Sequence, residues 1–210
     1  MKNLAIIGST GSTGKELVRL ALESNYYVTV VERSSNSIPV QGNLKVVKGD
    51  VTDLESLVSS LRNIDVVISC FGPAKHKEVG NLMSLGATNI VKACELNSVK
   101  RFVFMSGFVQ SDGEEFSLLT RLAIKVFRIY YKDSYKDKVI AEAAIEKSKM
   151  EWVIVRASGL AHSQPTGLYK AGVKEGISFN LMSYADCALC LLDAVEETRW
   201  TNQIINVGKY

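Results

Sequence analysis

Seven residues near the N-terminus combine three glycines with four hydroxyl side chains. They follow a short apolar run, Asn3–Ile7, and precede a segment with helical spacing that begins near Lys15. A strand, a glycine turn and a helix N-terminus in this order form a phosphate site, because the first N–H groups of a helix lack partners. The pattern predicts that a dinucleotide binds here. The loop residues are Gly8, Ser9, Thr10, Gly11, Ser12, Thr13 and Gly14.

Each glycine of this loop has an expected task. Gly8 permits the tight turn, Gly11 lets the backbone approach a pyrophosphate, and Gly14 packs the helix against the strand. The hydroxyl groups between them add hydrogen-bond donors. The alternative is a flexible loop that merely contains glycine. A P-loop is excluded, because the Lys-Ser/Thr pair that should close one is absent.

The end of the second expected strand bears on the choice of dinucleotide. An acidic residue there favours a free ribose hydroxyl, and a basic one favours a 2′-phosphate. Both are present, as Glu32 and Arg33, and Ser34 and Ser35 follow. Because a guanidinium can bind a phosphate through two hydrogen bonds, we expect NADP(H), with NAD(H) less favoured. The alternative is a solvated charge pair at a strand end.

Apolar runs of strand length alternate with segments of helical spacing along the chain. This alternation is typical of a parallel sheet buried on both faces. We therefore expect an α/β fold, a doubly wound parallel sheet (Rossmann fold). Residues 1–210 would form a single domain with a small C-terminal substrate-pocket portion. The expected strands are Asn3–Ile7, Tyr27–Val31, Leu44–Lys48, Asp65–Cys70, Arg101–Met105, Trp152–Arg156 and Gln203–Val207. The expected helices include Lys15–Ser24, Leu54–Leu61 and Val79–Asn97.

The segment Glu115–Ser148 has the least regular pattern. We interpret it as one helix, a break near Lys132–Tyr135, and a second helix that ends at Ser148. The first helix is rich in aromatic residues and could line a substrate pocket or cover the core. Covering the core is favoured, because apolar helix faces usually pack.

Composition excludes several classes of protein. The 210 residues carry a net charge of only +3, which predicts neither nucleic acid nor an anionic membrane as a partner. No leader peptide or spanning segment is expected. Cys187 and Cys190 form a CxxC without a second pair, so zinc is not expected. Buried reduced thiols indicate the cytoplasm. A small-molecule acceptor is the expected partner, and the chain is expected to be a monomer or homodimer.

Three motifs resemble the atypical branch of the short-chain dehydrogenase/reductase superfamily. They are GSTGSTG at 8–14, ER at 32–33, and GDVTD at 49–53. The nearest resemblance is to the NAD(P)H-binding, flavin-reductase and biliverdin-IXβ-reductase-like group, and it extends over nearly the whole chain. Segments 83–91, 104–107 and 166–169 also resemble parts of that group.

The resemblance implies positions for the cofactor. Asp50 and Val51 would face the adenine, and Ser106 would lie beside the nicotinamide. The residues along the middle of the cofactor would be Cys70, Phe71 and Gly72.

Two departures from the superfamily pattern affect the chemistry. Lys138 stands where the lysine of a Tyr-x-x-x-Lys pair belongs, but Ser134 occupies the tyrosine position and Tyr135 is one residue late. The biliverdin-IXβ-like members carry Pro-Pro-His after the sixth strand, whereas this chain has Ala157-Ser158-Gly159. Tetrapyrrole reduction is therefore disfavoured.

Two candidate catalytic residues remain, Ser106 and Lys138. Hydride transfer requires geometry, a dry pocket and a proton source. Ser106 could orient the acceptor or merely cap a turn, and Lys138 could act in the site or be a solvated helix lysine. His76 and His162 are expected at the surface. The sequence favours an NADPH-dependent reductase acting on a flavin, quinone or similar conjugated acceptor. The alternative is an NADP(H)-binding sensor without turnover.

Overall fold

The chain folds around one eight-stranded sheet of order β3-β2-β1-β4-β5-β6-β10-β8. This computed structural model describes residues 2–33, 42–73, 80–111, 113–178 and 180–210. All neighbouring strands are parallel except β8, which runs antiparallel to β10. The strands are β1 (Asn3–Ile7), β2 (Tyr27–Glu32), β3 (Leu44–Lys48), β4 (Val66–Ser69), β5 (Arg101–Gly107), β6 (Glu151–Ala157), β8 (Tyr169–Gly172) and β10 (Gln203–Lys209). The strand order confirms the doubly wound fold.

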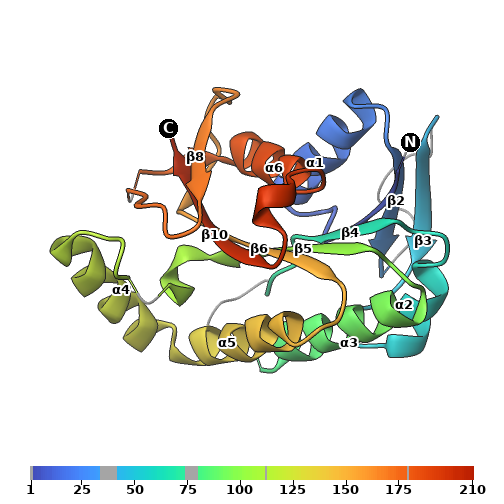
Figure 1. Cartoon of the computed structure of the whole chain (residues 1–210), viewed down its shortest axis with the longest axis horizontal. Coiled ribbons are helices and arrows are strands. Elements are labelled where there is room, and N and C mark those ends of the chain that lie inside the picture. The colour runs from blue at the N-terminus through green and yellow to red at the C-terminus, as the bar shows by residue number, and fades with distance from the viewer. Residues whose placement is uncertain (1, 34–41, 74–79, 112, 179) are drawn as a thin grey trace.

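Helices cover both faces of the sheet, as Figure 1 shows. On one face lie α1 (Ser12–Glu23) and α6 (Tyr184–Asp193). On the other lie α2 (Leu54–Ser60), α3 (Leu82–Leu96) and α5 (Lys132–Glu146). Helix α4 (Leu118–Tyr130) lies apart from both layers, beyond the carboxyl ends of the strands. The remaining elements are the short pair β7 (Leu160–Ala161) and β9 (Met182–Ser183), and the 3₁₀ helices η1 (Phe108–Gln110) and η2 (Thr198–Trp200).

Two apolar cores follow from the alternation of side chains along each strand. In β1, Leu4 and Ile6 pack with α1 and α6, whereas Ala5 and Ile7 pack with α2 and α3. All four are buried. A strand buried on both faces must be apolar throughout, which is why the apolar runs of the sequence mark the strands.

The segment Glu115–Ser148 differs from expectation in two ways. The two helices meet at Tyr131, just before the expected break. The expectation that the first helix covers the core is wrong, because Ile124 is the only residue of α4 that is buried. Strand β8 was not expected, since Tyr169–Gly172 is short and only partly buried.

Cys187 and Cys190 lie on the buried side of α6. Burial raises the pKa of the Cys187 thiol to about 12. A protonated thiol behaves as a small apolar group, so the CxxC of this chain packs the core.

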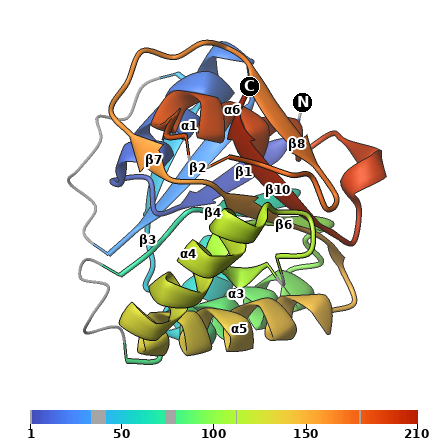
Figure 2. The ribbon, with the colours of Figure 1, turned by 90° about the vertical axis from the view of Figure 1, so that its left-hand side faces the viewer.

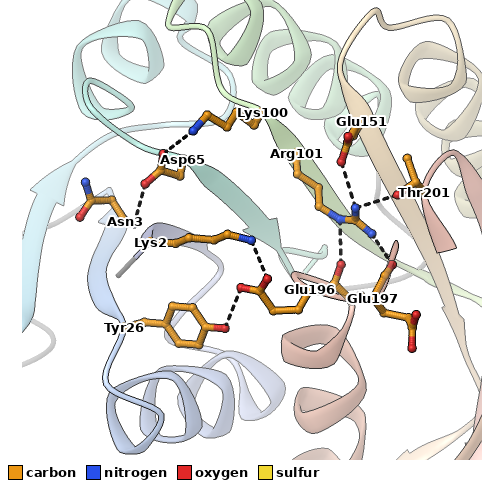
Figure 3. Close-up of polar contacts among 11 residues, drawn as sticks. Lys2, Asn3, Tyr26, Asp65, Lys100, Arg101, Glu151, Glu196, Glu197 and Thr201 are labelled. Carbon is orange, nitrogen blue, oxygen red and sulfur yellow. Dashed lines mark hydrogen bonds and ion pairs between the residues drawn. The ribbon is translucent and has the colours of Figure 1, made fainter. Parts of the chain in front are cut away.

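Arg101 organises the amino end of the sheet, at the start of β5 (Figure 3). Its buried guanidinium donates to the backbone oxygens of Ala194 at 2.9 Å and Glu197 at 2.8 Å, and to Thr201 Oγ1 at 2.8 Å. It also pairs with Glu151 at 3.0 Å. These bonds connect β5 to the turn that follows α6. They lie at the amino ends of the strands, whereas the glycine loop lies at the carboxyl ends.

We expect Arg101→Met to lower the free energy of unfolding by about 2–4 kcal/mol, because it leaves buried carbonyl oxygens without donors. Urea denaturation followed by circular dichroism measures this loss. The control is Lys100→Met, whose ammonium is exposed and reaches Asp65 only at 3.4 Å; it should cost no more than about 0.5 kcal/mol. Equal losses would show that Arg101 has no special structural part.

Candidate cofactor and active site

The glycine loop follows β1, and two of its glycines are required by the fold itself. Gly8 has φ +89°, and a Cβ there would stand 2.6 Å from the backbone nitrogen of Phe71. A Cβ on Gly14 would stand 2.1 Å from the carbonyl oxygen of Gly8. Gly11 is different, because it is exposed and its Cβ would meet only Gly8 O, at 3.4 Å. The fold therefore does not require glycine at position 11. A ligand that approaches the backbone there would require it.

The loop and the start of α1 fit a pyrophosphate. Gly11 is the N-cap of α1, with extended backbone, and no side chain in the described part of the chain caps this end. The first N–H groups of the helix are thus open to an anion, and the helix dipole favours negative charge there. Thr10 is exposed and Ser12 half-buried beside them, where their hydroxyls can add donors.

The end of β2 places a carboxylate against this loop. Ser9 Oγ donates to Glu32 Oε1 at 2.8 Å, and both residues are buried. Glu32 Oε2 is buried without a hydrogen-bond partner among the described residues. A buried carboxylate oxygen normally has a donor, so this atom marks a place for a ligand hydroxyl or water. Arg33 follows in an exposed position, whereas Ser34 and Ser35 lie outside the described residues.

The loop after β3 is held by α3. Thr52 donates to Asp50 from its backbone N–H and its hydroxyl, both at 2.8 Å, and these bonds lower the pKa of Asp50, with a smaller effect from Arg33. Asn89 of α3 donates to the carbonyl oxygen of Val51 at 2.9 Å. Asp50 and Val51 are therefore held in fixed positions at the carboxyl edge of the sheet.

The run 70–72 after β4 begins buried and becomes exposed toward its end. The Cys70 thiol is buried, lies 3.5 Å from the carbonyl oxygen of Ile7, and has its pKa raised to about 12 by burial. Phe71 is half-buried against Phe104, at 6.4 Å between ring centroids, and Gly72 is exposed. Cys70 can thus meet a cofactor only through its backbone.

The end of β5 carries a buried polar cluster. Ser106 Oγ donates to Glu142 Oε1 at 2.5 Å. Arg156 of β6 is paired with Ser106 in the sheet register and binds Glu142 Oε2 at 2.6 Å. The carboxylate of Glu142 is therefore neutralised by Arg156, and the proton of Ser106 is directed at it.

Lys138 lies beside this cluster on α5. Its Nζ is 3.8 Å from the position that a Cβ would take on Gly107. Desolvation lowers the pKa of Lys138, although the carboxylates of Glu142 and Asp137 oppose that effect. No hydrogen bond or ion pair joins the ammonium to a described residue, so it can act as a donor to a bound molecule.

The neighbours of Lys138 on α5 explain its position. Asp137 accepts from the backbone N–H groups of Met83 at 2.7 Å and Ser84 at 3.0 Å, which fixes α5 against the start of α3. Ser134, one turn before Lys138, is buried on the same side of the helix. Tyr135 instead lies under the guanidinium of Arg128, 4.7 Å from its ring centroid. A tyrosine close in sequence therefore does not take the place of the superfamily's tyrosine.

Three residues near the site were not assigned a part from the sequence. Glu142 and Arg156 complete the Ser106 cluster, and His162 Nε2 lies 3.5 Å from Ser12 Oγ of the glycine loop. The spacing Ser134, Lys138, Glu142 is a signal that could have identified Glu142, since residues four apart share a helix face. Arg156 and His162 depend on strand register and loop paths that the sequence does not reveal. His76 lies outside the described residues.

A cavity of about 670 Å³ lies elsewhere and is separate from this site. Its lining includes Tyr26, Tyr169 and Glu196, and it contains neither the glycine loop nor Ser106. Figure 3 shows Tyr26 and Glu196 at the amino end of the sheet, near Arg101. In open α/β sheets ligands bind at the opposite, carboxyl ends of the strands.

Comparison with known proteins agrees with this geometry. The sequence signature of the family described as NAD(P)H-binding matches residues 8–198. A chloroplastic Arabidopsis thaliana protein of uncharacterized function is 27% identical over 79% of this chain and 62% of its own length. An isoflavone reductase-like protein of Olea europaea is 34% identical over 50% of this chain, and 35% of its own length is covered. The chain thus spans less than two thirds of these curated relatives.

Solved structures show the same fold. A short-chain dehydrogenase/reductase from Veillonella parvula, in complex with NADP, has a TM-score of 0.78 at 19% identity. The alignment covers 99% of this chain and 94% of the Veillonella chain. The anaerobilin reductase ChuY of Escherichia coli has a TM-score of 0.78 at 18% identity, and the alignment covers 98% of this chain and 96% of the ChuY chain. The family match confirms the expected resemblance to an NAD(P)H-binding group, and the solved structures show that the fold is shared.

Proposed function

Because the chain belongs to the NAD(P)H-binding family, we propose that it is an NADP(H)-dependent reductase for a flavin, a quinone or a similar conjugated acceptor. One observation carries the proposal: the desolvated ammonium of Lys138 adjoins Gly107 and the Ser106–Glu142 pair. Strands β1, β4 and β5 are neighbours in the sheet. The carboxyl ends of β1 and β5 are therefore about 10 Å apart, which one dinucleotide can span.

Each residue of the site has a separate role in the proposed reaction. When bound, the reduced nicotinamide supplies a hydride, and the acceptor then gains negative charge. Lys138 holds a proton for that developing charge, and solvent restores the proton afterwards. Arg156 holds the carboxylate of Glu142 in place through their ion pair, and Glu142 in turn fixes the hydroxyl of Ser106. Because the one proton of Ser106 is directed at Glu142, Ser106 can position an acceptor only by accepting a hydrogen bond, and Lys138 is the proton donor.

The test is the oxidation of NADPH by the purified protein with a panel of flavins, quinones and aldehydes. We expect turnover with at least one conjugated acceptor, monitored by loss of the NADPH absorbance. Tight NADPH binding without turnover on any acceptor would contradict the reductase and favour the sensor. One feature supports that second candidate: Ser134 stands where the superfamily's tyrosine belongs.

The choice of NADP(H) rests on Arg33, which is exposed next to the glycine loop and close enough to Asp50 to lower the pKa of that carboxyl. We expect Arg33→Ala to weaken NADPH binding by about 1.5–3 kcal/mol, the range for a hydrogen bond to a charged group. NADH binding should hardly change. Fluorescence titration with both nucleotides measures the difference.

Glu32 provides the matched control. Glu32→Gln keeps the shape of the side chain but removes its negative charge, so NADPH binding should be unchanged or tighter, because a 2′-phosphate is repelled by a nearby carboxylate. If Glu32→Gln weakens NADH selectively, and Arg33→Ala weakens both nucleotides equally, Glu32 binds the ribose hydroxyls and the chain is specific for NAD(H).

A further inference from the structure

Helix α4 turns its apolar side away from the protein. Most of its large apolar residues are between 43% and 81% exposed. They occupy one half of the helix circumference, given 3.6 residues per turn. We call them the α4 face: Leu118, Leu119, Leu122, Val126, Phe127, Ile129 and Tyr130.

The polar side of the same helix faces inward. Arg128 donates to the carbonyl oxygens of Val109, at 2.9 Å, and Ser111. Arg121 donates to those of Phe116, at 3.1 Å, and Glu114. Both guanidinium groups are bound to backbone of the preceding loop, so they fix the rotation of α4. The outward direction of the α4 face is therefore built into the fold.

Within α4 itself the charge is of one sign, although exposed Glu114 precedes the helix and exposed Asp133 follows Lys132. Between Phe116 and Lys132 the chain has four basic residues and no Asp or Glu. Lys125 and Lys132 are exposed at the border of the face. Leucine and aromatic side chains on one side, with lysine and arginine beside them, are typical of helices that lie in the surface of an anionic bilayer. The small net charge of the whole chain does not reveal this local cluster.

The helix also lies at the carboxyl edge of the sheet. Figure 2 looks onto that edge and shows α4 in front of the rest of the fold, with the helix seen from the side. None of the helices in the described ranges is long and apolar enough to cross a membrane. A helix such as α4 can lie on a bilayer without spanning it.

We propose that the α4 face is a docking surface for the anionic headgroup region of a membrane. The apolar side chains enter the boundary between headgroups and acyl chains, and Lys125 and Lys132 meet the lipid phosphates. A second copy of the chain fits less well, because a twofold contact would place this patch against itself and bring the same lysines together. The proposal does not depend on the reductase activity.

The experiment is flotation of the purified full chain with lipid vesicles. We expect binding to vesicles that contain phosphatidylserine, much weaker binding to pure phosphatidylcholine, and loss of binding at high salt. The double substitution Leu122→Ser/Val126→Ser should reduce the bound fraction at least about tenfold, since two large apolar side chains leave the bilayer. The matched control is Leu96→Ser, which is 69% exposed at the end of α3 and should change nothing.

Two further measurements keep the outcome clear. Melting temperatures of the variants should equal that of the parent protein, because all three substitutions are at the surface. NADPH oxidation with a soluble acceptor should also be unchanged, which separates this proposal from the reductase. Absence of binding to anionic vesicles overturns it. So does a lipid-free dimer in sedimentation velocity that the double variant dissociates, because a second copy would then occupy the face.

Discussion

Replacing Gly11 by valine should remove dinucleotide binding while leaving the fold intact. Gly11 has φ −72°, a value open to any residue, and a Cβ would approach only Gly8 O, at 3.4 Å. A bound pyrophosphate would need the space that the new side chain takes. Loss of two charge-assisted hydrogen bonds alone lowers affinity by at least about 100-fold. Titration calorimetry with NADPH measures the change.

Gly14→Val is the informative contrast. A Cβ there would stand 2.1 Å from Gly8 O, so this variant should unfold or fail to accumulate rather than lose only the ligand. For Gly11→Val, the cost to stability should stay near 1 kcal/mol, because glycine is better than valine at an N-cap. Unchanged NADPH affinity in a folded Gly11→Val protein would refute the assignment of the loop.

The central strands of the sheet could be predicted from the sequence because they are buried on both faces. Runs such as Val66–Ser69 have no solvent side, so they carry no polar alternation and stand out between helical segments. The glycine loop could be predicted for a related reason. Gly8 and Gly14 meet backbone atoms at distances that exclude any side chain, and this requirement appears directly as residue type.

The buried cluster could not be predicted, because its members meet only through the tertiary fold. Ser106 and Arg156 lie 50 residues apart in sequence and become neighbours through the register of β5 and β6. The sequence also could not predict which way the apolar side of α4 faces, for a similar reason. Its spacing predicts an apolar side, but only the bonds of Arg121 and Arg128 to the preceding loop determine that this side faces outward.

Lys138→Met should lower turnover of a carbonyl or quinone acceptor by about 10²- to 10⁴-fold, the usual contribution of a positioned general acid. NADPH affinity should stay close to that of the parent protein, since the substitution keeps an unbranched side chain beside Gly107. Ser106→Ala should cost less, about tenfold, because a neutral hydroxyl that positions the acceptor transfers no proton. Steady-state kinetics together with NADPH titration separate the two effects.

The pH profile tests the proton directly. Lys138 is active as an acid when protonated, so turnover should be constant at low pH and fall as pH rises through the pKa of Lys138. Desolvation lowers that pKa from its ordinary value of 10.5, so the fall should come at a lower pH than for an exposed lysine. Lys138→Arg keeps the positive charge but cannot release a proton at such pH. It should therefore remain slow and lose the pH-dependent step, whereas full activity in this variant would show that Lys138 contributes only its charge.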